Sequence, residues 1–304
     1  MESWEKIDAV QRMQDYIEEY LAEPITLKKL AQAAGYSPWH STRIFKELLG
    51  KTPFEYIRSL RLSQAAIKLR DEDAKVIDVA FDFVFNSHEG FTRAFSKQFG
   101  MRPSQYSKNT PPLQLFMPNS IRDYYLSLQK GAGENMCKKS KPNAVFVQVV
   151  DRPGRKLIVK RGTNATHYFE YCDEVGCDVW GILSSIKEAL YEPIGMWMPE
   201  NLRSPGTSLY TQGVEVPADY NGIVPEGFEL VDLQPCKMMV FQGRPYDDEN
   251  FQEAIGEVGE VMKDYDPEIY GFTWADEDGP RFQLAPMGYR GYIEARPVRQ
   301  INIR

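Results

Sequence analysis

Threonine and arginine side chains at one recurring spacing are the first residues of this sequence that could do chemistry. The stretches from Thr42 to Tyr56 and from Thr92 to Tyr106 share Thr, Arg, Phe, Gly, Pro and Tyr in register. A hydroxyl beside a guanidinium can hydrogen-bond base edges and phosphates when a helix presents both to a DNA groove. The repeat therefore predicts two equivalent helices presented by one domain.

Turn signals place the first Thr-Arg pair on the second helix of a helix-turn-helix. Thr26 can cap a helix over Leu27–Ala34, Gly35 can adopt the left-handed conformation of a tight turn, and Ser37-Pro38 can start a helix over Pro38–Leu49. The exposed faces of this helix and of its copy carry the candidate DNA contacts: Trp39, Thr42, Arg43, Lys46, Ser87, His88, Glu89, Thr92, Arg93 and Lys97.

A long helix is expected to connect the two units. Pro53 to about Arg70 would span about 27 Å at ~1.5 Å per residue, and the second unit follows as helices over Val76–Phe83 and Ser87–Phe99. Adjacent major-groove faces of B-DNA lie ~34 Å apart on one side of the duplex. The spacing therefore suits a monomer that reads two successive grooves, with a helix over Trp4–Leu21 bracing the first unit.

The charge is unevenly distributed along the chain. The formal net charge is −7, yet residues 26–110 hold 14 basic against 8 acidic side chains. A locally cationic region suits double-stranded DNA as a partner. The alternative is an ordinary all-α bundle in which Arg43 and Arg93 are merely solvated.

This arrangement resembles the DNA-binding domain of the AraC/XylS family of transcription regulators over residues 5–108. The resemblance rests on Leu30 to Ser37 with Arg43 and Phe45, and on Phe85 to Phe95 with Phe99 to Tyr106. It implies base contacts at the positions matched by Trp39, Thr42, Arg43, His88, Glu89, Thr92 and Arg93.

One residue departs from the pattern of that family. Val84 stands where the family has glycine, before the phenylalanine of the second turn. A β-branched residue adopts a positive φ only at a cost. We therefore expect either a turn reshaped through the additional residue Asn86 or a second unit that docks differently, and the first reading helix is the safer DNA contact.

The boundaries follow from composition. We expect a DNA-binding domain at 1–109, a linker at 110–142 rich in Pro, Gly, Lys and Ser, and a second domain at 143–304. Within the linker, Ile121–Leu128 could form a short helix whose apolar residues pack on another part of the chain.

A second duplication defines the distal domain. Residues 149–162 align without gaps on residues 230–243, with five of fourteen positions identical. Each copy reads as two strands followed by a helix, over Tyr168–Leu190 and Asp248–Asp264, and then further strands: Gly195–Met198 and Ser208–Val216, then Tyr270–Trp274, Arg281–Ala285 and Arg290–Arg296. The fold class is therefore multidomain, all-α and then α+β, with the α+β units related by a pseudo-twofold axis.

A groove between such units is the default place for a small ligand. Aromatic residues and a carboxylate gather in this half, and alternation places Tyr292, Glu294 and Arg296 on one strand face. An acid among aromatic rings attracts a cation. The candidate ligand contacts are Tyr171, Trp180, Trp197, Tyr270, Trp274, Tyr292 and Glu294; the alternatives are core aromatics and an Arg-paired or solvated glutamate.

Residues 143–303 resemble the GyrI-like effector-binding domain, a resemblance of pattern. It implies binding of hydrophobic, often cationic, compounds between the repeats. That family commonly has a glutamate in the penultimate strand, where this chain offers Gln283. A neutral amide supplies no charge, which puts a preference for cations in question and weakens a hydrolase reading.

Three functions remain. The leading hypothesis is a one-component transcription regulator that binds promoter DNA and senses a small apolar or cationic effector. The second is a DNA-bound hydrolase with Glu294 as general base and Tyr292 assisting; the third is an interaction protein that contacts RNA polymerase.

Several classes are disfavoured. We expect a cytoplasmic protein without a membrane span, because no run approaches ~18 apolar residues. No metal or cofactor is expected, because four cysteines without a Cys-x-x-Cys pair accompany only three histidines.

Overall fold

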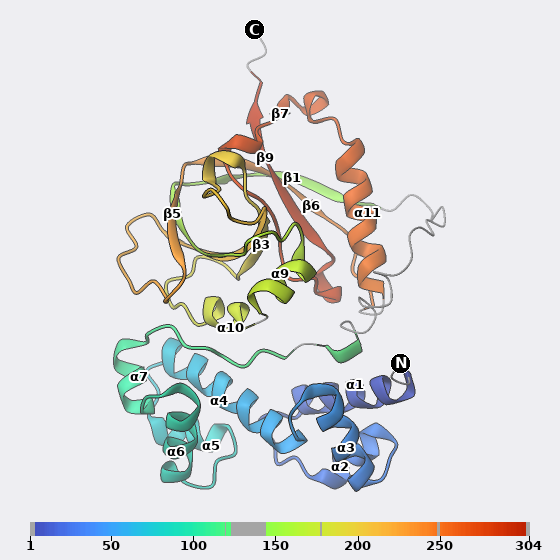
Figure 1. Cartoon of the computed structure of the whole chain (residues 1–304), viewed down its shortest axis with the longest axis vertical. Coiled ribbons are helices and arrows are strands. Elements are labelled where there is room, and N and C mark those ends of the chain that lie inside the picture. The colour runs from blue at the N-terminus through green and yellow to red at the C-terminus, as the bar shows by residue number, and fades with distance from the viewer. Residues whose placement is uncertain (1–3, 119, 123–143, 177, 248–249, 302–304) are drawn as a thin grey trace. The chain divides into compact units, whose positions relative to one another are not determined.

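The computed structural model describes residues 4–118, 120–122, 144–176, 178–247 and 250–301. The chain divides into two compact units, Met1–Met136 and Cys137–Arg304 (Figure 1). Within the described residues, no helix has the length and apolar character needed to cross a bilayer.

The first unit is helical, and its local sequence signals explain where the helices begin and end. Thr26 and Ser37 cap α2 and α3 through their side-chain oxygens, and Gly35 between these helices has a φ of 74°. These features confirm the predicted first helix-turn-helix. The helices are α1 (Trp4–Glu19), α2 (Leu27–Ala34), α3 (Pro38–Leu49), α4 (Pro53–Asp71), α5 (Val76–Asp82), α6 (His88–Phe99) and α7 (Pro103–Asn109).

Helix α4 joins two separate cores. Its first half packs with α1–α3 and its second half with α5–α7, which Figure 1 shows at its two ends. The residues that recur between the two repeats occupy equivalent places: the rings of Phe45 and Tyr56 are 5.4 Å apart in the first core, and those of Phe95 and Tyr106 are 5.8 Å apart in the second. Burial raises the pKa of each tyrosine to about 12. The duplication therefore preserves a packing unit.

Residues 110–118 and 120–122, predicted as the start of the linker, pack on this helical unit. Leu113 and Leu115 enter the second core and Ile121 the first. The Phe116 amide donates to Ser63 Oγ at 2.7 Å, and the Ile121 amide donates to Gln14 Oε1 at 3.1 Å. The remainder of the predicted linker, including Tyr124, Tyr125 and Leu128, lies outside the described residues.

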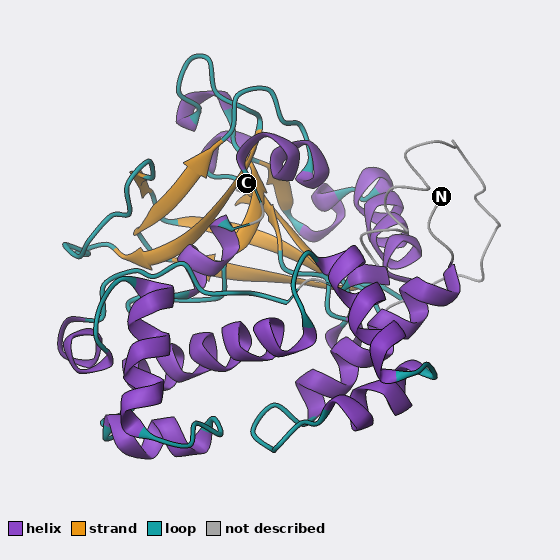
Figure 2. Cartoon of the chain, turned by 60° about the horizontal axis from the view of Figure 1, so that its bottom comes forward, coloured by secondary structure: helices purple, strands orange, loops and turns teal. Residues whose placement is uncertain are grey.

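The second unit is built on an antiparallel sheet, whose strands are orange in Figure 2. The strand order is β1-β6-β9-β8-β3-β4-β2-β5, and β7 pairs with β9. Strand β1 pairs with β6 and β2 with β5, so the first two strands of each predicted repeat pair with strands of the other repeat. The strands are β1 (Phe146–Arg152), β2 (Arg155–Arg161), β3 (Ile194–Trp197), β4 (Tyr210–Pro217), β5 (Glu229–Leu233), β6 (Cys236–Gln242), β7 (Phe272–Trp274), β8 (Arg281–Gln283) and β9 (Ile293–Gln300).

Two helical expectations in this unit need correction. The predicted single helix over Tyr168–Leu190 is wrong: α9 (Tyr168–Val175) stops at Gly176, where φ is 96°, and α10 (Val179–Ser184) follows. Helix α11 (Phe251–Asp264) matches the second predicted helix from Phe251 onward.

Three strands begin later than predicted: β4 at Tyr210, β7 at Phe272 and β9 at Ile293. Pro267–Tyr270 forms a 3-10 turn before β7, and Gly291, with a φ of 78°, precedes β9. Strand β9 also ends later than predicted: it continues to Gln300, beyond the predicted end at Arg296.

Candidate DNA-binding surface and ligand cleft

Helix α3 presents an exposed face that carries the first set of predicted DNA contacts. Trp39 is 70% exposed, and Arg43 and Lys46 are also exposed. The guanidinium of Arg43 lies 5.7 Å from the centroid of the Trp39 ring, and its Nε donates to Glu47 Oε1 at 2.6 Å. Thr42 is half-buried, and its hydroxyl donates to the Pro38 carbonyl at 2.9 Å. Arg43 is therefore held along its own helix.

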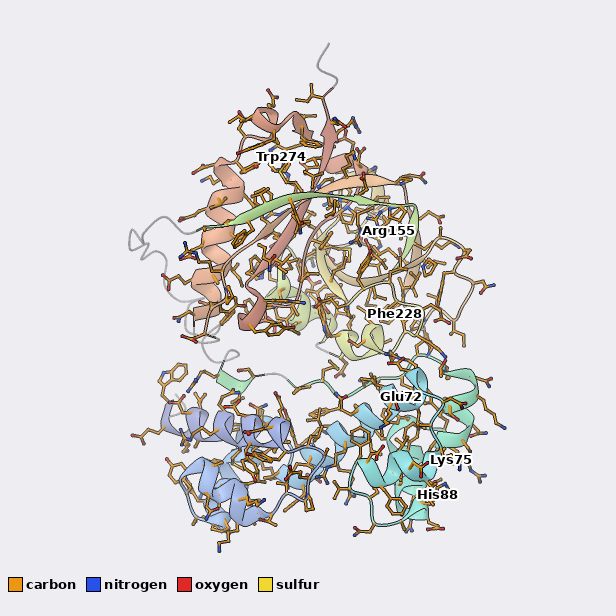
Figure 3. All side chains as sticks on the ribbon, turned by 180° about the vertical axis from the view of Figure 1, so that it is seen from behind. Glu72, Lys75, His88, Arg155, Phe228 and Trp274 are labelled. Atoms are coloured by element: carbon orange, nitrogen blue, oxygen red, sulfur yellow. The ribbon has the colours of Figure 1, made fainter. Side chains whose placement is uncertain are left out.

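Helix α6 presents the second set. His88, labelled in Figure 3, lies at the first residue of the helix, and it is exposed together with Glu89, Arg93 and Lys97. Ser87 caps the helix by accepting from the Gly90 amide at 3.0 Å. Among the described residues Arg93 has no ion-pair partner, which distinguishes it from its counterpart Arg43.

Two predicted contacts of this face are not freely available to DNA. The Ser87 oxygen is occupied as the cap, and the Thr92 hydroxyl is buried. The polar groups that this face offers freely are therefore concentrated in His88, Glu89, Arg93 and Lys97.

The turn before α6 differs from our expectation. Val84 itself adopts the left-handed conformation, with a φ of 62°, in place of a turn reshaped through Asn86. The Phe85 amide donates to the Ala80 carbonyl at 2.9 Å, which closes the turn. A non-glycine residue in this conformation costs about 1–3 kcal/mol and persists only when its surroundings fix it. Here the core residues of α5 and α6 on either side of the turn, Ala80 and Phe91 among them, hold the turn in place.

In the sheet unit, one face of the central strands brings together the predicted residues Trp197, Gln283, Tyr292 and Glu294. Strand register explains this: Gln283 lies opposite Glu294 across β8 and β9, and Trp197 lies opposite Arg281 across β3 and β8. Residues opposite each other project from the same face of a sheet. The sequence pattern alone did not select Arg281.

A chain of hydrogen bonds connects these side chains. The Tyr292 hydroxyl lies 2.9 Å from Gln283 Oε1 and 3.0 Å from Glu294 Oε2, and Gln283 Nε2 donates to the Tyr210 hydroxyl at 3.0 Å. Arg281 Nε donates to Glu294 Oε1. Burial, followed by the charge of Glu294, raises the pKa of Tyr292, so this hydroxyl stays protonated and donates. The Glu294 carboxylate is therefore engaged at both oxygens.

A hollow of about 280 Å³ opens beside this chain of hydrogen bonds. Its walls include Trp197, Asp276, Arg281 and Arg296. The Arg281 guanidinium lies 4.8 Å from the centroid of the Trp197 ring, and the Arg296 guanidinium lies 4.2 Å from that of Trp274, which Figure 3 labels. Arg281 connects this hollow with the chain of hydrogen bonds among Tyr210, Gln283, Tyr292 and Glu294. We call the hollow and these side chains together the cleft.

Three other predicted ligand contacts lie elsewhere. Tyr171 is a buried residue of α9 and donates to the Lys160 carbonyl at 2.7 Å, while its ring lies 5.8 Å from that of Tyr210. Trp180 is half-buried on α10. Tyr270 is 64% exposed and stacks on Tyr265. A larger hollow, of about 590 Å³, lies between residues 163–166 and 200–209 and is lined by no aromatic side chain.

Glu215, a buried carboxylate of β4, lies on the opposite face of the sheet. It pairs with Arg155, labelled in Figure 3, at 2.7 Å and also with Arg152. The Arg152 guanidinium lies 4.3 Å from the centroid of the Tyr191 ring. Strand alternation separates Glu215 from Tyr210 and the cleft, so its role is in packing.

Comparison with known proteins concerns the helical unit. Residues 30–109 match the family model of a helix-turn-helix domain. The transcriptional regulator Rob of Salmonella typhimurium is 39% identical over 108 residues, which are 33% of this chain and 37% of Rob. The chain thus spans little more than a third of this relative.

Two further similarities fall in the same region. The probable transcription factor PqrA of Proteus vulgaris is 39% identical over 97 residues, which are 31% of this chain and 80% of PqrA. The solved DNA-binding domain of AdpA, in complex with a target DNA, is 28% identical and covers 33% of this chain and 91% of its own, with a TM-score of 0.32. Through its helical unit, the chain belongs to the AraC/XylS family of helix-turn-helix transcription regulators.

Proposed function

We propose that the protein is a one-component transcription regulator that binds double-stranded promoter DNA, in the cytoplasm, through α3 and α6. The observation that carries this is the equivalence of the two helices: each follows a left-handed turn residue, buries a phenylalanine, and exposes an arginine one residue after a threonine. Exposed cations on the outer faces of two such helices suit phosphate contact and base readout.

Arginine substitution tests the DNA contacts. Arg43→Ala and Arg93→Ala should each weaken binding to the cognate site roughly 5- to 150-fold if the side chain is bidentate to a guanine. The loss should be small on random duplex. The control is Arg58→Ala, which removes an exposed cation of α4 outside both reading helices.

Gel shift at two salt concentrations separates the outcomes. A loss that is equal on cognate and random duplexes would identify phosphate contacts. Unchanged binding by both variants would refute the proposal that α3 and α6 read DNA.

We further propose that the sheet unit is a pair of α+β repeats around a pseudo-twofold axis. Strand order supports this, because exchanging β1 with β5, β2 with β6, β3 with β8 and β4 with β9 reproduces the same sheet. Under this exchange Tyr210 corresponds to Tyr292, and Gln283, which bonds both hydroxyls, lies at the centre. The cleft then lies where the two repeats meet.

The cleft suits a small apolar or amphipathic effector. It combines an aromatic wall with a few convergent polar groups, as ligand sites do. Both oxygens of Glu294 are engaged and Tyr292 stays protonated, so neither is placed to take a proton from a substrate. Sensing is therefore better supported than hydrolysis.

Thermal unfolding of the full chain with a panel of neutral aromatics and cationic dyes tests effector binding. Stabilisation without product supports a sensor, and turnover of a panel compound would favour the enzyme. If no compound of the panel stabilises the protein or is turned over, a DNA-bound interaction protein that contacts RNA polymerase would be favoured. An effector alters DNA binding only if it binds one state of the protein more tightly than another.

A further inference from the structure

We propose that Arg281 is a built-in cation that occupies the position of a cationic ligand and makes the cleft reject small cations. The inference rests on the proposed function of the cleft as a ligand site. It assigns to one residue the selection of ligand charge at that site.

Arg281 makes the two contacts that would hold a cationic ligand. Its Nε donates to the carboxylate of Glu294, and its guanidinium stacks on Trp197 at 4.8 Å from the ring centroid. A buried carboxylate and an aromatic face are the groups that attract cations in proteins. Because one residue occupies both, an incoming cation finds its charge partner already neutralised.

The Glu294 carboxylate that pairs with Arg281 is buried, so the Arg281 charge is needed to compensate it. The Glu294 side chain is 4% exposed, whereas that of Arg281 is 41% exposed. An uncompensated carboxylate at this depth is strongly unfavourable. Without the Arg281 charge, the buried carboxylate should therefore bind another cation at this position.

The remainder of the cleft would stay in place without the Arg281 charge. The Trp197 indole Nε1 donates to the Thr166 carbonyl at 3.0 Å, which holds the ring wall. The Tyr292 hydroxyl at 3.0 Å holds the other oxygen of Glu294. The adjoining hollow of about 280 Å³ provides the volume for a small aromatic cation.

Arg296 offers a matched contrast at the same mouth. It also stacks on a tryptophan and pairs with an acid, Asp276, at 2.7 Å. The Asp276 side chain is 56% exposed, so water can solvate it without Arg296. Loss of Arg296 should therefore create no cation site.

The experiment measures binding of benzyltrimethylammonium and of its neutral isostere neopentylbenzene to the full chain by calorimetry. Arg281→Gln should bind the cation at least about tenfold more tightly than the wild type, by analogy with desolvated cation–π and charge-pair energies. Arg281→Lys and Arg296→Gln should behave like the wild type. The gain should disappear in the double variant with Glu294→Gln.

The neutral isostere separates two kinds of failure. Neopentylbenzene should bind the wild type and all variants alike. If it binds but Arg281→Gln gains nothing for the cation, or if the wild type already binds the cation as tightly, the role of Arg281 is refuted and the cleft stands. If neither probe binds any variant, the cleft itself is refuted as a ligand site.

Two comparisons isolate the charge and guard against a folding defect. A gain in Arg281→Lys equal to that in Arg281→Gln would show that space, not charge, is decisive, and would refute the proposal. Arg281→Ala, which uncovers the same carboxylate, is measured beside Arg281→Gln. Melting curves establish which variant is folded, and the folded variant decides the test.

Discussion

Replacement of Glu215 by glutamine should destabilise the sheet unit strongly. The side chains of Glu215 and Arg155 are 2% and 1% exposed, and Arg152, 13% exposed, shares the same carboxylate. Removal of one partner of a buried ion pair costs about 3–5 kcal/mol, and the amide of glutamine recovers about 1 kcal/mol by accepting one hydrogen bond. We therefore expect a net loss of about 2–4 kcal/mol. The melting temperature of a unit of this size should fall by about 5–15 °C.

Urea denaturation of the full chain measures this loss. Trp180, Trp197 and Trp274 report on the sheet unit, while far-UV circular dichroism follows the helical unit. The matched control is Asp151→Asn on β1, whose side chain is 80% exposed and whose partner Lys237 is 36% exposed. Its loss should be below about 1 kcal/mol. If the two variants lost the same stability, the argument from burial would be wrong.

Three further predictions follow from the helical unit. Val84→Gly should leave the free energy of unfolding unchanged or raise it by up to about 1 kcal/mol, because relief of backbone strain offsets the greater chain entropy of glycine. Gly35→Val at the matching turn should lower it by about 1–3 kcal/mol. Urea denaturation curves that reversed this order would contradict the strain argument. Gln14→Leu should cost about 2–4 kcal/mol, because the Tyr56 hydroxyl and the Ile121 amide both lose a buried partner; unaltered hydrogen exchange at the Ile121 amide would count against it. Glu47→Gln should strengthen DNA binding roughly twofold at low salt, because it releases the Arg43 side chain from its ion pair. A gel shift that showed weaker binding would mean that Glu47 holds Arg43 in the orientation that contacts DNA.

The helical unit was largely predictable because its signals are local. Thr26, Gly35 and Ser37 each determine the conformation of a few neighbouring residues, and the structure places each of them as their types require. The recurrence of Phe and Tyr identified a packing unit that occurs twice. Val84 was the exception, since the packing of α5 and α6 overrides its intrinsic preference.

Segments without periodicity were less predictable. The segment from Leu113 contributes scattered side chains to two separate cores, Leu113 and Leu115 to one and Ile121 to the other. No 3.6-residue or two-residue pattern marks such a segment. The break after α9 was missed for a related reason, because the apolar residues on both sides of Gly176 suggested one continuous helix.

The cleft shows most clearly where inference from sequence stops. Strand alternation correctly placed Tyr292 and Glu294 on one face, and an acid among aromatic residues suggested a site for a cation. The charge of the site depends on a cross-strand neighbour, however, and that neighbour is determined by the pairing of Gln283 with Glu294, which brings Arg281 to the same carboxylate. Gln283 lacks a charge at the position where the resemblance implied one, while Glu294 supplies a carboxylate one strand away and Arg281 neutralises it. We therefore expect the ligand charge preference proposed for this cleft to depend on strand register, through the one arginine that register places beside Glu294.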